Sequence, residues 1–148
     1  MTEVRACRLG AANGDGGGGS LGHVELGGSR LTGLNLGEAR LTQVRFHGCK
    51  LDYASFRHGT LHDVTFEDCV MARADFQGAT LRGVRFAGCQ LLETDFSKAA
   101  LNSVDLRGSE LALAGSLLGL RGAVIDSLQL MDLAPTIAHE IGIRVEQA

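Results

Sequence analysis

The stretch VTFEDCVMARADFQGATLRGVRFAGCQ, residues 64–90, indicates the architecture because its residues recur at fixed intervals. Phenylalanine stands at positions 66, 76 and 86, and cysteine stands at positions 69 and 89. An α-helix repeats about every 3.6 residues and a plain strand repeats every second residue, so neither produces intervals of ten and twenty. A larger structural repeat must therefore generate this spacing.

That repeat is five residues long. From position 21 to position 111, every fifth residue is large and apolar, nineteen times in succession, and we call this position the centre of each five. Two residues before the centre the chain places a small or β-branched residue, such as Val44, Cys49 or Ala54. Side chains on one face of a strand recur at every second residue, so this pair indicates an extended segment. The three remaining positions are mostly polar or glycine and indicate a corner.

Four fives are predicted to form one square coil, because like residues recur at intervals of twenty. Valine occupies positions 24, 44, 64, 84 and 104, and the next column is Ser29, Cys49, Cys69, Cys89 and Ser109. Successive coils are then expected to pair as parallel strands about 4.8 Å apart. All six phenylalanines fall into two columns on opposite sides of the coil. The predicted core ladder is Phe46, Phe56, Phe66, Phe76, Phe86 and Phe96.

The pattern, as seen in ADFQG, ATLRG and VRFAG, resembles that of the pentapeptide-repeat family. The similarity covers residues 21–111 and implies an all-β fold, a right-handed quadrilateral β-helix of about five coils. Within the family, the chain resembles the loopless, quinolone-resistance-type members of bacteria, which act as DNA mimics. This resemblance implies DNA gyrase or another type II topoisomerase as the partner, and altered sensitivity to quinolones or other topoisomerase poisons as the outcome.

Both ends of the repeat need covers, because a terminal coil exposes apolar side chains and an unpaired strand edge. Residues 1–20 are expected to form a capping strand and a glycine-rich loop, residues 21–116 the β-helix, and residues 117–148 a helical cap. In the cap, Asp126 or Ser127 is expected to begin a short helix that Pro135 restarts.

The expected cap continues to a helix stop at Gly142 and a last strand over residues 143–146. The segment is richer in apolar residues than a plug for one end of the rod requires, which predicts a homodimer joined end to end. The predicted dimerisation residues are Leu128, Leu130, Met131, Leu133, Ile137 and Ile141.

The net charge of −3 and the pI near 5.9 argue against direct nucleic-acid binding, which works by neutralising phosphates. Asp75 and Asp95 are twenty residues apart and are expected to stack on one side, with Glu93 at the adjoining corner. Either they form a surface for a partner, or they form a solvated face that Arg73 partly offsets. The predicted partner-binding acidic face is Asp63, Glu67, Asp68, Asp75, Glu93 and Asp95.

The sequence predicts no enzyme, cofactor or metal site. The glycines at 14, 16 and 19 match a dinucleotide-binding pattern only outside its strand-and-helix context, and the histidines at 47, 58 and 62 are placed on different sides. The cysteines are interpreted as small core residues with reduced thiols, which is typical of a cytoplasmic protein, and no apolar run is long enough for a membrane span. The function predicted is therefore that of a non-enzymatic binding protein. The alternative to a gyrase-binding DNA mimic is a general protein–protein interaction scaffold.

Overall fold

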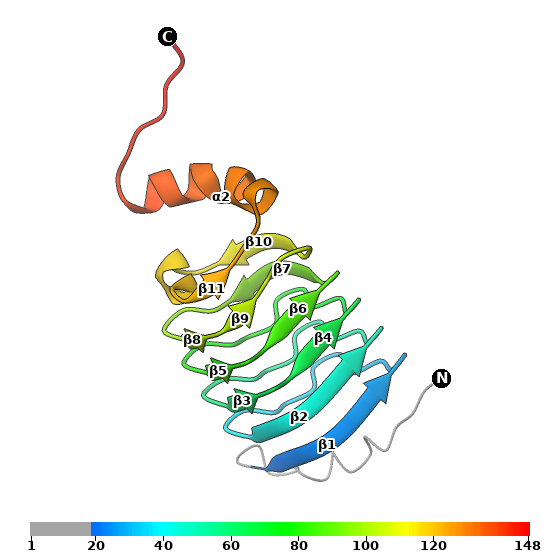
Figure 1. Ribbon diagram of the computed structural model, residues 1–148. Coiled ribbons are helices and arrows are strands. Elements are labelled where there is room, and N and C mark those ends of the chain that lie inside the picture. Colours follow the sequence, from blue (N-terminus) through cyan, green and yellow to red (C-terminus); the bar gives the residue numbers. More distant parts are fainter. Residues whose placement is uncertain (1–18) are drawn as a thin grey trace.

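Successive coils of twenty residues lie directly above one another in the structure, a computed structural model that describes residues 19–148 (Figure 1). The parallel register pairs Leu21 with Leu41, Leu41 with Leu61, Leu61 with Leu81 and Leu81 with Leu101. The predicted right-handed quadrilateral β-helix of nearly five coils is confirmed. Because each of these steps is twenty, the five-residue pattern places each residue above its equivalent in the coil before.

The strands are short, since each must bend at the next corner. The longest are β1 (Ser20–Gly27), β2 (Arg40–His47) and β7 (Gln90–Asp95). The others are β3 (Thr60–His62), β4 (Thr65–Glu67), β5 (Thr80–Arg82), β6 (Arg85–Ala87), β8 (Ala100–Asn102), β9 (Val104–Asp105), β10 (Glu110–Ala114) and β11 (Ala123–Val124). The larger sheet runs in the order β11-β9-β6-β4-β2-β3-β5-β8, with β1 on β2, and β10 pairs with β7 in a second sheet.

The rod has four faces, which we number by their inward-pointing centres. The centres of the first face are Leu41, Leu61, Leu81 and Leu101; of the second, Phe46, Phe66, Phe86 and Leu106; of the third, Leu51, Met71, Leu91 and Leu111; and of the fourth, Phe56, Phe76 and Phe96. Each of these side chains is at most 9% exposed. The rod is therefore filled, and its interior holds no ligand-sized space in the described coils.

The core ladder predicted from the sequence is also confirmed. Within the second-face column, the rings of Phe46 and Phe66 stack with centroids 4.9 Å apart, and those of Phe66 and Phe86 with centroids 4.8 Å apart. The fourth-face column stacks in the same way, and the two columns meet edge to face at 5.7–6.2 Å. Offset-stacked and edge-to-face contacts are both favourable for aromatic rings, so the ladder stabilises the coil spacing in both directions.

Every corner has one residue in the left-handed backbone region. From position 23 to position 108, each fifth residue has a positive φ, and eleven of these eighteen residues are not glycine. Residues with a side chain adopt this region at a cost in free energy, which glycine avoids. The corners therefore carry a strain that the continuous core offsets.

The cysteine column belongs to the core, in agreement with the packing interpretation. The thiols of Cys49, Cys69 and Cys89 are buried, and each lies within hydrogen-bond distance of a carbonyl oxygen of the coil below, at 3.3–3.6 Å. Ser109 ends the column and donates to the Phe86 carbonyl at 2.9 Å. The pKa of the Cys69 thiol is raised by hydrogen bonding with the Cys49 and Cys89 thiols and by burial, so it stays protonated.

The last coil leads into two helices. The 3-10 helix η2 (Leu117–Leu120) follows a register shift between Ala112 and Ala114, and α2 (Ser127–Glu140) lies across the end of the rod (Figure 1). The expectation that Pro135 restarts the helix is wrong, because α2 is continuous and Pro135 lies inside it.

The chain after α2 departs from the sequence expectation in one respect. Gly142 follows the helix with a φ of +86° and the Gly142 N–H donates to the His139 carbonyl, as expected of a helix stop. The last strand expected over residues 143–146 is wrong, because residues 143–148 lead away from the rod and pair with none of its described strands (Figure 1). The capping strand and glycine-rich loop predicted for residues 1–20 lie, except for the last two residues of this range, outside the described residues.

Candidate functional site

The first half of α2 is fixed to the rod by a buried glutamine. The Asp126 carboxylate accepts a hydrogen bond from the Gln129 N–H at 2.9 Å, and the Gln129 side chain accepts one from the Asp126 N–H, which is a capping box. The Gln129 amide Nε2 also donates to the carbonyls of Leu106, at 2.6 Å, and Ser109, at 2.7 Å. One side chain thus starts the helix and satisfies two carbonyls of the last coil.

The second half of α2 is fixed by a carboxylate. Glu140 accepts hydrogen bonds from the Ser116 hydroxyl and from the Leu117 N–H, both at 2.7 Å. The bond from Ser116, followed by that from Leu117, holds the pKa of Glu140 below its ordinary value. Sequence reasoning missed both Gln129 and Glu140. The spacing of Asp126 and Gln129 is a capping-box signal that could have identified the former, whereas nothing local to Glu140 predicts its contact with η2.

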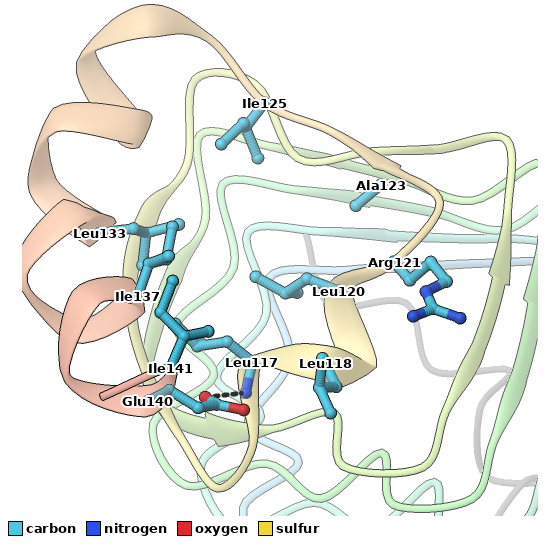
Figure 2. Close-up of a pocket in the computed structure, with 10 residues that line it drawn as sticks. All are labelled: Leu117, Leu118, Leu120, Arg121, Ala123, Ile125, Leu133, Ile137, Glu140 and Ile141. Atoms are coloured by element: carbon cyan, nitrogen blue, oxygen red, sulfur yellow. Dashed lines mark hydrogen bonds between the residues drawn. The ribbon is translucent and has the colours of Figure 1, made fainter. Parts of the chain in front are cut away.

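Between these two attachments α2 stands away from η2 and leaves an apolar hollow of about 320 Å³. In Figure 2, Leu133 and Ile137 of α2 and Ile141 directly after it face Leu117 and Leu120 across the hollow. The Glu140 carboxylate closes one end at the Leu117 N–H. The helix therefore covers the last coil only in part.

The structure divides the six predicted dimerisation residues into two groups. Leu128, Leu130, Met131 and Ile141 are between 51% and 74% exposed. Leu133 is only 4% exposed and packs with the core of the last coil, and Ile137 is half-buried against it. These last two residues hold the helix on the rod, so they are not free to contact another molecule.

Exposed apolar residues gather at this end of the described chain. Nine large hydrophobic side chains in residues 19–148 are exposed, and eight of them lie between positions 118 and 145. They are Leu118, Val124, Leu128, Leu130, Met131, Ile141, Ile143 and Val145. We call these eight residues the C-terminal apolar surface. The ninth is Tyr53 at a corner of the rod, where the Arg73 guanidinium lies 6.0 Å from its ring.

The acidic residues singled out in the sequence do not form one face. Asp63 lies at the corner after the first face, Glu67 on the second face and Asp68 at the corner after it. Asp75 and Asp95 lie on the fourth face, where they pair in register on neighbouring coils as predicted, and Glu93 lies at the corner before them. The expected single acidic face is therefore wrong. The four-residue difference between Asp63 and Glu67 moves the chain round a corner, so nearness in sequence does not place these residues on one side.

Most of these carboxylates already have partners. Arg45 bridges Glu67 on one side and Glu25 on the other, and its hydrogen bond lowers the pKa of Glu67. Arg73 pairs with Glu93 at 3.1 Å, as expected from their spacing, and Arg57 lies 3.7 Å from Asp75. Exposed pairs of this kind contribute little stability, but they reduce the negative field of the rod.

Asp75 and Asp95 also have a backbone role. The Asp75 Oδ1 accepts a hydrogen bond from the Gln77 N–H at 2.9 Å, and the Asp95 Oδ1 accepts one from the Ser97 N–H at 2.8 Å. Asp105 repeats this turn on the second face by accepting from the Arg107 N–H, and the Arg107 guanidinium holds the Asp105 pKa at about 2. These aspartates are therefore turn residues.

The described residues contain no cluster of histidine, cysteine, aspartate or glutamate that could hold a metal ion. His62 lies beside Asp63, with 3.8 Å between Nε2 and Oδ2. In the part of the chain from residue 19 onward, no helix is long and apolar enough to cross a membrane.

With the square coil and its five-residue register established, the comparison with protein families is decisive. The pentapeptide repeat region model matches residues 39–114, which is more than half of the chain. The chain belongs to the pentapeptide-repeat family. No curated protein has a matching sequence.

Among solved structures, the chain is similar to QnrB1, described as a plasmid-mediated fluoroquinolone resistance protein. The identity is 20%, 86% of this chain and 83% of QnrB1 are covered, and the TM-score is 0.39. HetL of Nostoc sp. strain PCC 7120, involved in regulating heterocyst differentiation, is 22% identical over 74% of this chain and 47% of its own, with a TM-score of 0.35. Rfr23 of the cyanobacterium Cyanothece 51142 is 14% identical over 66% of this chain and 64% of its own, with a TM-score of 0.43.

Proposed function

We propose that this pentapeptide-repeat protein is a non-enzymatic binding protein that works as a homodimer joined through its C-terminal apolar surface. The observation that carries the proposal is the concentration of exposed apolar side chains between positions 118 and 145. Exposed apolar side chains that gather at one end of a protein are typical of an interface.

A second copy of the chain is the simplest partner for this surface. In a twofold contact the same patch serves both subunits, so the assembly closes with no further complementary surface. Leu128 and Met131 stand one turn apart and point away from the rod, because the side of α2 that faces the rod carries Gln129 and Leu133. Two rods joined in this way would present eight side faces to a partner.

Sedimentation of the full chain at micromolar concentration tests the homodimer. The proposal predicts a dimer at this concentration, and a monomer would show that the surface is covered in another way or left free. The same measurement on a chain ending at residue 126 should give a monomer, since that chain lacks most of the surface. A dimer that survives this deletion contradicts the proposed interface.

The resemblance to quinolone-resistance-type proteins adds a candidate partner, DNA gyrase, for which the dimer would act as a DNA mimic. The observation in its favour is the in-register stacking of Asp75 and Asp95, which places carboxylates at the coil spacing on the fourth face. The DNA-mimic candidate needs a strongly acidic rod, but Arg57 and Arg73 offset two of the carboxylates in this region. A general scaffold for another protein partner, which would not need a negative surface, is favoured by these paired charges.

A gyrase supercoiling assay with and without a quinolone distinguishes these candidates. A DNA mimic should inhibit supercoiling or protect gyrase from the quinolone, and the double variant Asp75→Asn with Asp95→Asn should lose much of this effect. Asparagine can still accept the Gln77 and Ser97 hydrogen bonds, so the variant removes charge without removing the turns.

Asp105→Asn is the matched control, because Asp105 makes the same turn on a different face. If the native chain has no effect on gyrase, the gyrase candidate is wrong and the homodimer proposal stands unchanged. If the double variant acts like the native chain while the native chain affects gyrase, another face makes the contact.

A further inference from the structure

The first face of the rod has a regular array of outward side chains. The register places Arg40, Thr60 and Thr80 in one column, and Thr42, His62 and Arg82 in the column beside it. Between the columns the leucine centres point inward and are buried. The six residues therefore form a grid of two columns and three coils, with an arginine at two diagonally opposite corners. We call it the arginine–threonine grid.

The grid lines a shallow hollow of about 400 Å³ on the sheet surface. Arg40 and Arg82 are two coils apart, so their Cα atoms are separated by about 10 Å along the rod. Thr42, Thr60, Thr80 and His62 line the hollow together with the two arginines. Each of these polar side chains carries a group that can donate a hydrogen bond.

The charge of this face differs from that of the whole chain. The outward strand positions of the first face, from Ser20 in the first coil to Asn102 in the last, carry two arginines and no carboxylate. The net charge of the whole protein, in contrast, is −3. Arg82 forms no ion pair with any described residue. The nearest acids, Glu38 and Asp63, lie at the two corners that border the face. The outward positions of the grid are therefore positive, and the corners that border the face carry a single described acid on each side.

We propose that the arginine–threonine grid binds a short chain of linked phosphates, such as inorganic tripolyphosphate. Guanidinium groups bind phosphate oxygens through paired, charge-assisted hydrogen bonds, and hydroxyls donate to the oxygens between them. A linear oligophosphate lying diagonally across the grid contacts Arg40 at one end, Thr60 and His62 in the middle and Arg82 at the other end. This proposal is independent of the homodimer and of gyrase.

Two features of the first face favour binding of an oligophosphate over binding of an acidic protein or a nucleic acid. Protein interfaces are anchored by buried apolar or aromatic side chains, and the grid residues exposed on this face include none. Single-stranded nucleic acids are bound by stacking their bases on aromatic side chains, which the first face also lacks at its outward positions. Phosphates without bases need only the donors that are present.

Isothermal titration of the full chain with tripolyphosphate at pH 7 and low salt tests the proposal. The native chain should bind it, and Arg82→Ala should weaken binding on the order of tenfold, the loss expected for one charge-assisted pair of hydrogen bonds. Arg82→Lys should give an intermediate affinity because it keeps the charge but not the paired geometry. Combining Arg40→Ala with Arg82→Ala should remove measurable binding.

Arg85→Ala is the matched control, since Arg85 lies in the same coil but on the second face. The proposal is overturned if tripolyphosphate does not bind, or if Arg85→Ala weakens binding as much as Arg82→Ala does. It is also overturned if poly-glutamate or a short DNA single strand binds the grid more tightly than tripolyphosphate. A spectrum that shows each variant to be folded excludes unfolding of the rod as the cause of weaker binding.

Discussion

The rod buries its apolar side chains, whereas the C-terminal segment leaves most of its large apolar side chains exposed. From Leu36 to Phe96 the rod buries every centre, and Phe66 and Leu61 have no exposed surface at all. In the segment from position 118 to position 145, Leu133 is buried whereas Leu128 and Met131 are at least 70% exposed. The rod satisfies its own apolar pattern because each coil covers the next. The segment has no further coil above it, so its apolar side chains need a partner.

The largest loss of stability is expected when an aromatic ring is removed from the core ladder of the rod. Phe66→Ala should lower the free energy of unfolding by about 3–5 kcal/mol, because the ring is fully buried between two stacked neighbours. Urea unfolding measures the change. Thr65→Ala, one residue away and outward-facing, should stay within about 0.5 kcal/mol of the native chain. Equal stability of Phe66→Ala and the native chain would contradict the assigned register.

The attachment of the cap to the rod is tested at Gln129. Gln129→Met keeps the length of the side chain but removes the donor to the Ser109 carbonyl and leaves the Leu106 carbonyl with the Ser109 N–H alone, so we expect a loss of about 2–3 kcal/mol. Unfolding should be followed by far-UV circular dichroism at one protein concentration, since dimerisation changes the apparent stability. Asp132→Ala on the exposed side of α2 is the control. If both variants unfold alike, Gln129 does not hold the cap.

The exposed side of the cap is tested at Met131. Met131→Lys should weaken the dimer by about 2 kcal/mol, roughly thirtyfold, if this side chain lies near the centre of the interface. The fold should be unaffected, because the Met131 side chain is 70% exposed in the single chain. Sedimentation equilibrium measures the change, and Thr32→Lys on the third face of the rod adds the same charge as a control. A dimer of unchanged affinity would place the interface elsewhere.

The smallest expected effect concerns the strained corners of the rod. Lys98 has a φ of +59° and an exposed side chain, so Lys98→Gly should raise the free energy of unfolding by about 0.5–1 kcal/mol. Lys98→Ala removes the same charge without relieving the backbone and should not be stabilising. Thermal unfolding of the two variants compares them directly. If Lys98→Ala stabilises the protein and Lys98→Gly leaves its stability unchanged, charge and not backbone strain dominates at this corner.

Much of the rod could be predicted because its pattern is periodic. Once Val44, Cys49 and Phe46 are assigned to columns, the register of twenty assigns the residues of all the remaining coils to columns as well. The phenylalanine ladder then follows without further information. The acidic residues could not be placed with the same success. The positions of Asp63, Glu67 and Asp68 relative to the corners were available, but the pairing of Glu67 with Arg45 depends on where a long side chain extends between coils.

The coil, its four faces and the identity of the core thus follow from the amino-acid sequence, because a strict repeat allows only one register in which all apolar centres are buried. The position of the cap on the last coil does not. Gln129 and Glu140 fix α2 through contacts with residues more than nineteen positions away, and these contacts select which side of the helix is buried. A contact between unlike segments leaves no period in the sequence. The sequence therefore grouped Leu128 and Met131 with Leu133, and only the position of the helix separates the exposed residues from the buried one.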